Sequence, residues 1–237
     1  MPDEDFDLER LAAYLHLDLN QVTKLAERGK LPGRKVAGVW RFAQAEIHHW
    51  LEERIGLSDS FELARVEEAL ARHREATAES PESITDMLPL VAIEIPFPAR
   101  TRNSVITSMI DVAARTGWLW DPEKMSEAVR SREDMFPTAL ETGVALLHPR
   151  RPLGGILDRP FLALGITDRG VPFASQRGML TDVFFLICSS EDRGHLQTLA
   201  RLSRLLAEPG FLTALRGVTS AVAAHDLIVE QEGKLPN

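Results

Sequence analysis

Residues 142–152 read TGVALLHPRRP, a short apolar run that ends in a histidine and is followed at once by two arginines between two prolines. The run at 143–147 is typical of a strand buried on both faces. His148 comes directly after it, at the carboxyl end of a strand, where α/β sheets usually present their ligands. The stretch therefore predicts a cationic edge of a sheet that handles an anion at His148.

Further apolar runs alternate with helical patterns along the rest of the chain. These runs cover residues 91–95, 161–166 and 182–188. Residues 101–117 have the apolar spacing of an amphipathic helix that stops at Gly117, and Asp121-Pro122 has the cap chemistry that opens another helix. The chain ends in helical patterns beyond residue 192. This interleaving predicts one α/β domain over residues 82–232, with a mixed β-sheet flanked by helices.

The composition is that of an ordinary globular protein. The chain has 237 residues, 44% of them apolar, and a net charge of −8. Its acidic beginning lacks the basic and apolar regions of a signal peptide, and no uncharged apolar run reaches the ~18 residues of a membrane span. We therefore expect a soluble, cytoplasmic protein without membrane insertion. Any affinity for nucleic acid must come from a local basic patch.

Residues that would indicate a metal, a cofactor or another catalytic chemistry are few. The single cysteine, Cys188, ends an apolar run and is expected in the core, so neither a disulfide nor a zinc ribbon is predicted. Asp158, Asp168 and Asp182 are too scattered to indicate a metal site. The sequence contains neither a P-loop nor the nucleophile elbow of serine hydrolases. We expect no metal and no cofactor.

A basic patch lies near the beginning of the chain. Residues 19–42 contain six lysines and arginines against one acidic residue, Glu27. Apolar spacing predicts two short helices, the second starting at Asp18 and stopping at Gly29, followed by a small two-stranded wing around Ala37-Gly38. A closing helix is predicted over residues 43–55. The pattern is that of a helix-turn-helix.

The segment 6–55 resembles the winged helix-turn-helix of excisionases, a relative of the MerR class of regulators. The likeness lies in DLERLAAYLHLDLNQVTKLAERGKLPGRKVAGVWRF and in the helix that ends in HHWL. It implies two sets of DNA contacts. Those of the second helix with base edges are Asn20, Gln21, Lys24 and Arg28, and those of the wing with phosphates are Arg34, Lys35 and Arg41. The alternative is a small protein-binding module whose charges are solvated.

Residues 58–79 predict one exposed helix between the two parts. Residues spaced alternately by three and four along this helix form one heptad-like stripe, here called the seam. These residues are Leu63, Val66, Leu70, His73 and Thr77. The seam spans barely two heptads and its last positions are polar, whereas a stable coiled coil needs three or four. A solvated linker and a homodimer contact through 58–79 both remain open. His16, His48, His49 and His225 are expected to have local structural roles.

The segment 82–232 resembles enzyme IIA of the fructose/mannitol type in the bacterial sugar phosphotransferase system, including its nitrogen-regulatory branch. The likeness lies in four stretches, ITDML, SRED, GVALLHPR and DVFFLICSSEDRGHLQTLARLSRLL. It implies the enzyme IIA type-2 fold and a phosphohistidine transfer activity. His148 would take a phosphoryl group from a phosphocarrier protein, with Arg132 beside it and His195 as a second histidine.

Two residues depart from the pattern of that family around His148. Leu147 replaces the proline before the histidine, and Pro149 replaces the glycine after it. Pro149 has no N–H to offer a phosphate. Arg150 and Arg151 would supply the lost donors, because a guanidinium suits phosphate. A degenerate domain that senses a ligand or partner without being phosphorylated, and a histidine with a structural role, remain alternatives.

The two resemblances together predict a regulator that couples phosphotransferase status to transcription. Its expected parts are a DNA-binding domain at 6–55, a helical linker at 56–81 and an enzyme IIA-like domain at 82–232. The alternatives are an enzyme IIA component of a sugar-transport phosphorelay and a non-phosphorylated adaptor.

Overall fold

The computed structural model describes residues 5–15, 18–43, 46–47, 50, 83–135, 137–173 and 179–235. It contains two compact units, the first built mainly from Met1–Pro81 and the second from Glu82–Thr198 and Leu205–Asn237. Each unit is described by itself below. Within the described residues, no helix is both long and apolar enough to cross a membrane.

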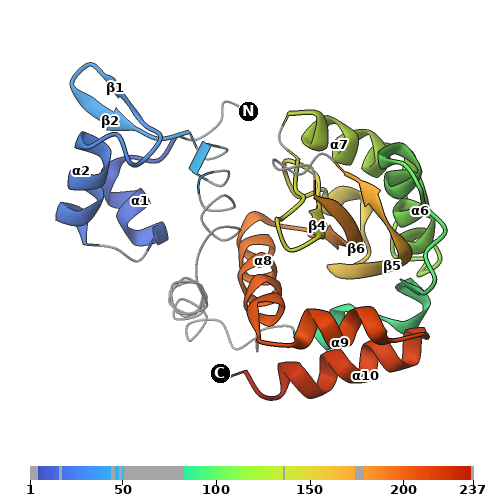
Figure 1. The fold of residues 1–237 in the computed structure, drawn as a ribbon. Helices are drawn as coiled ribbons and strands as arrows, with labels where there is room; N and C mark the ends of the chain where they lie inside the picture. Colours follow the sequence, from blue (N-terminus) through green and yellow to red (C-terminus); the bar gives the residue numbers. More distant parts are fainter. Residues whose placement is uncertain are drawn as a thin grey trace. The chain divides into compact units, whose positions relative to one another are not determined.

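The N-terminal unit is a helix-turn-helix with a wing, as predicted. Helices α1 (Leu8–Leu15) and α2 (Leu19–Glu27) are followed by an antiparallel hairpin of β1 (Arg34–Val36) and β2 (Val39–Arg41) (Figure 1). Its buried apolar residues are Leu11, Ala12, Val22, Ala26, Leu31, Phe42 and Ile47. They come from both helices, from the loop and from beyond the wing, so one small core joins all of these elements.

Local chemistry sets the ends of these elements. Asp18 caps α2, and its backbone N–H donates to Oε1 of Gln21 at 3.1 Å. Gly29, with a φ of 65°, ends the helix in the left-handed region that favours glycine. The turn of the wing has positive φ at both Ala37 (51°) and Gly38 (82°), as in the two-residue turns that match the twist of a hairpin.

Part of the predicted closing helix is described. Glu46, Ile47 and Trp50 are helical, and Nε1 of Trp50 donates to the carbonyl of Lys30 at 2.7 Å. The predicted linker helix at 58–79, with its seam at Leu63, Val66, Leu70, His73 and Thr77, lies outside the described residues. So do His16, His48 and His49.

The C-terminal unit contains a mixed four-stranded sheet. Its strands are β3 (Ile93–Glu94), β4 (Val144–Leu147), β5 (Phe161–Pro172) and β6 (Leu180–Cys188), in the order β3-β5-β6-β4. Strands β3 and β5 pair in parallel, as do β4 and β6, whereas β5 and β6 are antiparallel. The predicted mixed sheet is confirmed, but the strand expected over 91–95 is shorter, because Leu90–Ala92 forms a 3-10 turn, η2.

Helices flank this sheet (Figure 1). They are α5 (Ile84–Met87), α6 (Arg102–Ala114), α7 (Pro122–Met135), α8 (Asp192–Ala207), α9 (Phe211–Gly217) and α10 (Ala221–Glu232), with a 3-10 turn η3 (Gly154–Ile156). Helix α7 begins at Pro122 as expected, and Asp121 accepts from the backbone N–H of Lys124 at 2.9 Å. Gly117, with a φ of 72°, follows α6 where a stop was predicted.

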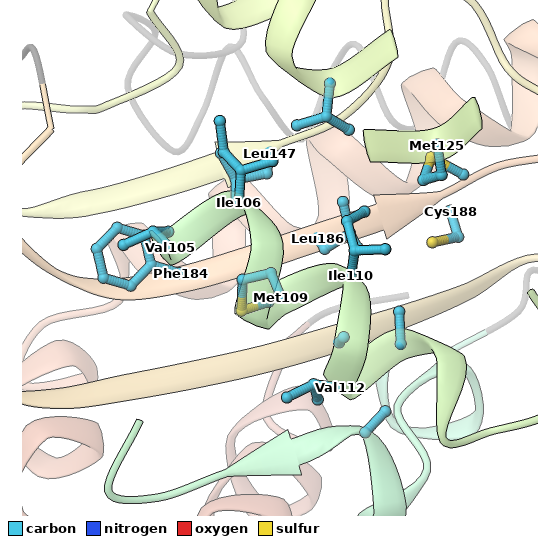
Figure 2. Close-up of a cluster of buried hydrophobic side chains, with 14 of the residues drawn as sticks. Val105, Ile106, Met109, Ile110, Val112, Met125, Leu147, Phe184, Leu186 and Cys188 are labelled. Atoms are coloured by element: carbon cyan, nitrogen blue, oxygen red, sulfur yellow. The ribbon is translucent and has the colours of Figure 1, made fainter. Parts of the chain in front are cut away.

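One face of α6 packs against the sheet to form the main core. Figure 2 shows side chains of this cluster, with Val105, Ile106, Met109, Ile110, Val112, Met125, Leu147, Phe184, Leu186 and Cys188 labelled. Gly165 of β5 lies at the closest approach. A Cβ there would lie 2.8 Å from the ring of Phe97 and 2.9 Å from the sulfur of Met109.

Strand direction brings three chain segments to one edge of the sheet. Leu147 of β4 lies beside Leu186 of β6, and Cys188 at the end of β6 lies opposite Phe161 at the beginning of β5. The carboxyl ends of β4 and β6 therefore meet the amino end of β5. His148 follows β4 at this edge and Ser189 follows β6.

Candidate functional site

His148 is fixed in place by its own strand. His148 is only 3% exposed, so it is almost fully buried at the edge of the sheet. Nδ1 lies 2.7 Å from the carbonyl oxygen of Leu146. A carbonyl oxygen can only accept a hydrogen bond, so Nδ1 is the donor and carries the ring hydrogen. In the neutral ring, the lone pair is then on Nε2.

His195 lies beside His148. It is the fourth residue of α8 and only 4% exposed, and the centroids of the two imidazole rings are 4.9 Å apart with the ring planes tilted by 55°. The Nε2 atoms of both rings are buried. The structure thus brings together the two histidines that the sequence singled out.

Ser189 also lies at this site, although no motif in the sequence points to it. It is 4% exposed, and its Oγ lies 3.1 Å from Nδ1 of His195. A clue was its position immediately after an apolar run, since the ends of β4 and β6 must lie together once these strands pair in parallel. That pairing itself is not readable from the local sequence, because it depends on which strands are neighbours.

The chain that follows His148 is fastened to the same end of β6. The backbone N–H of Leu153 donates to the carbonyl of Ser189 at 3.2 Å. Gly154 packs closely against the backbone of Ser190, the residue after Ser189. A Cβ on Gly154 would lie 2.6 Å from the carbonyl oxygen of Ser190. Pro149 is buried, whereas Arg150 and Arg151 are exposed. The segment 149–152 is therefore a short cationic loop, and the residues that follow it, Leu153 and Gly154, are held against the end of β6.

The last turn of α7 contributes two buried charged residues, Arg132 and Glu133. Glu133 is 1% exposed and accepts hydrogen bonds from the backbone N–H and from Oγ1 of Thr138. Burial raises the pKa of Glu133 above its ordinary value, while the hydrogen bonds from Thr138 and the electrostatic interactions with His148 and Arg102 act in the opposite direction. Glu133 lies within the SRED stretch, yet only its burial reveals it as part of the surroundings of His148.

The residues predicted to contact DNA lie on α2 and the wing. Asn20, Gln21 and Lys24 are exposed on α2, and Arg28 is exposed at its C-cap, although Oε1 of Gln21 accepts a hydrogen bond from the backbone N–H of Asp18. On the wing, Arg34 pairs with Asp5 at 2.8 Å and the ammonium of Lys35 lies 5.1 Å from the ring centroid of Trp40. Arg41 is half-buried. The cations therefore line one helix and one hairpin of a single small unit.

Other reactive groups are structural where the chain is described. Cys188 is buried in the core, and this burial raises the pKa of its thiol and disfavours the nucleophilic thiolate. His225 is half-buried on α10. Among the described residues, no three histidine, cysteine or carboxylate side chains gather as a metal site would require.

Two family models match the chain. The model described as phosphoenolpyruvate-dependent sugar phosphotransferase system, EIIA 2, matches residues 87–231, and a helix-turn-helix domain model matches residues 6–55. The two matches fall on the two parts in which the sheet and the winged unit are found.

Two curated relatives match the C-terminal part. The fructose-specific EIIABC component of the PTS system of Bacillus subtilis strain 168 is 28% identical over 151 residues, which are 63% of this chain but 23% of the relative. The fructose-specific EIIA component of Haloferax volcanii is 24% identical over 149 residues, 62% of this chain and 95% of the relative. The chain thus spans less than a quarter of the first relative and nearly all of the second.

Solved structures share the fold. The nitrogen regulatory protein IIA-Ntr of Neisseria meningitidis has a TM-score of 0.54 at 22% identity, covering 61% of this chain and 98% of that one. The IIA mannitol structure of Escherichia coli has a TM-score of 0.52 at 18% identity, covering 59% and 97%. A complex of enzyme IIAMTL with phosphorylated enzyme IIBMTL from the same species also scores 0.52 at 18%, covering 60% and 99%.

Proposed function

Because this chain belongs to the EIIA type 2 family of the phosphoenolpyruvate-dependent sugar phosphotransferase system, we propose that it is a phosphotransferase-linked regulator. In this proposal His148 accepts a phosphoryl group from a phosphocarrier protein, and the helix-turn-helix unit binds DNA. One observation carries it. The hydrogen bond from Nδ1 of His148 to the carbonyl of Leu146 leaves the lone pair of the neutral ring on Nε2, beside a second histidine.

The transfer step follows from that tautomer. Nε2 of His148 attacks the phosphorus atom of the phosphohistidine on the donor protein, in line with the bond that breaks. The donor ring carries a hydrogen on its other nitrogen, so it takes back the electron pair of that bond and leaves as a neutral imidazole, while a new phosphorus–nitrogen bond forms on His148. Nδ1 keeps its hydrogen and its bond to Leu146 throughout, so the acceptor ring needs no proton transfer.

Cations and His195 would stabilise the transferred group. Arg132 and Arg150 are the proposed partners of the phosphoryl oxygens, because a guanidinium binds these oxygens with two donors at once. His195 orients the group from the neighbouring ring. Pro149 cannot donate a backbone hydrogen bond, so the donors that a glycine amide would offer must come from these side chains.

The test is phosphoryl transfer in solution. The full-length protein is incubated with phosphoenolpyruvate, enzyme I and the phosphocarrier protein, and its intact mass is measured. We expect one added phosphoryl group that survives mild base and is absent from His148→Ala. The matched control is His225→Ala, which removes a half-buried histidine of α10 and should be labelled like the wild type. Labelling that persists in His148→Ala would disprove the assignment of the acceptor.

The proposed regulator has three parts, a DNA-binding domain at 6–55, a linker at 56–81 and a phosphotransferase domain at 82–232. We propose that a phosphoryl group on His148 changes the affinity for DNA through the linker, and that homodimers form through 58–79. Dimerisation would let two helix-turn-helix units bind two half-sites of DNA. Comparing the DNA affinity of the phosphorylated and the unphosphorylated protein tests the coupling. Measuring the molar mass of the protein in solution tests whether it forms a dimer.

A non-phosphorylated sensor is the second candidate. The burial of His148 and the buried Pro149 beside it favour this alternative, because an acceptor must meet its donor and because the proline offers no N–H. If the native donor proteins leave the mass unchanged while DNA binding persists, the sensor is the function to adopt.

An enzyme IIA of a sugar-transport phosphorelay is the third. The fructose-specific names of the two curated relatives favour it. It predicts that phosphorylated His148 passes its group to an enzyme IIB protein and that the chain has no measurable affinity for DNA.

A further inference from the structure

The hydroxyl of Ser189 and the ring of His195 form a buried pair at the edge of the sheet. Oγ lies 3.1 Å from Nδ1, and both residues are almost fully enclosed. Hydrogen bonds hold the backbone of both residues in place. The carbonyl of Ser189 accepts from Leu153, and the backbone N–H of His195 donates to the carbonyl of Glu191 at 3.1 Å in the first turn of α8. The contact is thus held from both sides.

A serine hydroxyl can donate to Nδ1 or accept from it, and the two choices give different rings. If Ser189 donates, neutral His195 carries its hydrogen on Nε2. If Ser189 accepts, the hydrogen is on Nδ1 and Nε2 carries a lone pair. The hydrogen bond at Nδ1 therefore determines what Nε2 can do.

The neighbouring histidine decides between these choices. His148 already presents a lone pair at Nε2, because its Nδ1 donates to Leu146. A phosphoryl group on His148 carries oxygens that only accept hydrogen bonds. An adjacent ring 4.9 Å away assists such a group only if its Nε2 donates. A second lone pair would oppose both the nucleophile and the anion. A charged imidazolium in this buried site would be costly to desolvate.

We propose that Ser189 is a positioning residue that donates to Nδ1 of His195 and thereby holds this ring as the Nε2–H tautomer. His195 then offers a hydrogen-bond donor to the phosphoryl group on His148. The second half of this statement rests on the proposed function, whereas the tautomer itself does not. Groups that orient a functional side chain in this way are typically worth about 10–100-fold in activity.

The tautomer is measured directly by NMR. The full-length protein is labelled with 15N at histidine, and long-range proton–nitrogen correlations assign the hydrogen of each ring, with His195→Gln identifying the signals. We expect Nε2–H for His195 in the wild type. Ser189→Ala should shift its two nitrogen signals toward a mixture of tautomers, and Ser189→Thr, which keeps the hydroxyl, should restore the wild-type pattern. Ser190→Ala removes the adjacent exposed serine and should change nothing.

Kinetics give the second measurement. Ser189→Ala should lower kcat for phosphoryl transfer about 10–100-fold with little change in KM for the phosphocarrier. The reason is that the surface that binds the phosphocarrier stays intact, whereas the Nε2–H group of His195 is no longer held as a hydrogen-bond donor. Ser189→Thr should recover most of the rate. A hydroxyl with a merely structural role would not move the tautomer.

The outcomes separate the two proposals. Nδ1–H or imidazolium in the wild type, or an unchanged Nε2–H in Ser189→Ala, overturns the role of Ser189. The wild-type measurement alone is decisive if Ser189→Ala does not fold. If no phosphoryl group is transferred but the tautomer still depends on Ser189, the proposed function fails and the positioning role stands.

Discussion

The imidazole of His148, at the end of β4, lies 4.9 Å from the imidazole of His195, in the first turn of α8. Each ring is held through Nδ1, the first by the carbonyl of Leu146 and the second by the hydroxyl of Ser189. In both rings Nδ1 is thus engaged in a hydrogen bond, and Nε2 is the nitrogen that can take part in phosphoryl transfer. The pair is built from three segments that meet only because β4 and β6 run side by side.

Removing His195 should slow phosphoryl transfer without removing the acceptor. We expect His195→Ala to lower the rate of labelling of His148 by about 10²–10³-fold, the typical cost of losing one preorganised donor to a developing anion. Single-turnover labelling followed by intact mass measures the rate. His225→Ala provides the control, and wild-type kinetics in His195→Ala would show that the second ring has no part in the transfer.

DNA binding should depend on the cations of the N-terminal unit. The double variant Lys24→Ala/Arg28→Ala should lose affinity for duplex DNA, and Lys35→Ala should reduce the slope of log affinity against log salt by about 0.9. Fluorescence anisotropy with a duplex selected from a random pool, measured at several salt concentrations, gives both quantities. Lys124→Ala, which removes a cation of α7 in the other unit, should leave them unchanged. Binding unaffected by the double variant would favour a protein-binding module.

The buried carboxyl of Glu133 should give the protein a pH-dependent stability. Its folded-state pKa is raised above 4.5, mainly by desolvation, so the folded state binds this proton more tightly than the unfolded state. The free energy of unfolding should therefore fall as the pH rises from 4.5 through the raised pKa. Urea denaturation across this range should show a component that Glu133→Gln lacks.

The control for this prediction is Glu127→Gln, which changes an exposed residue of the same helix and should keep the wild-type profile. A Glu133→Gln profile parallel to that of the wild type would mean that Glu133 is not the group responsible.

Gly165 should not tolerate a methyl group. Its Cβ would lie within 3.0 Å of the buried side chains of Phe97 and Met109, which would have to shift, so Gly165→Ala should cost about 1–3 kcal/mol of stability. Gly155→Ala is the matched control, because a Cβ there meets nothing within 4 Å. Equilibrium urea unfolding compares the two, and equal stability of both variants would contradict the packing of α6 on β5.

Local chemistry made much of the fold predictable. The central parts of β4, β5 and β6 are apolar and buried, and Asp18, Asp121 and Gly117 mark helix ends by capping or by positive φ. The family models confirm the expected phosphotransferase and helix-turn-helix resemblances. The predicted roles of the site residues remain predictions.

The strand expected at 91–95 shows where local chemistry is insufficient. Its apolar residues favour a strand, but only Ile93 and Glu94 have partners, Leu164 and Gly165 of β5. The preceding residues turn as a 3-10 helix after Pro89. Strand length is thus set by the neighbour across the sheet and cannot be read from one segment.

The sequence by itself determined which residues are apolar, where helices start and stop, and that a histidine followed by two arginines ends a buried strand. The tertiary structure alone decided that Ser189 meets His195 and that Glu133 is buried near His148. The physical reason is range. Capping and periodicity act within a few residues, whereas burial, hydrogen bonding between distant segments and the resulting tautomers depend on which strands pair and in which direction.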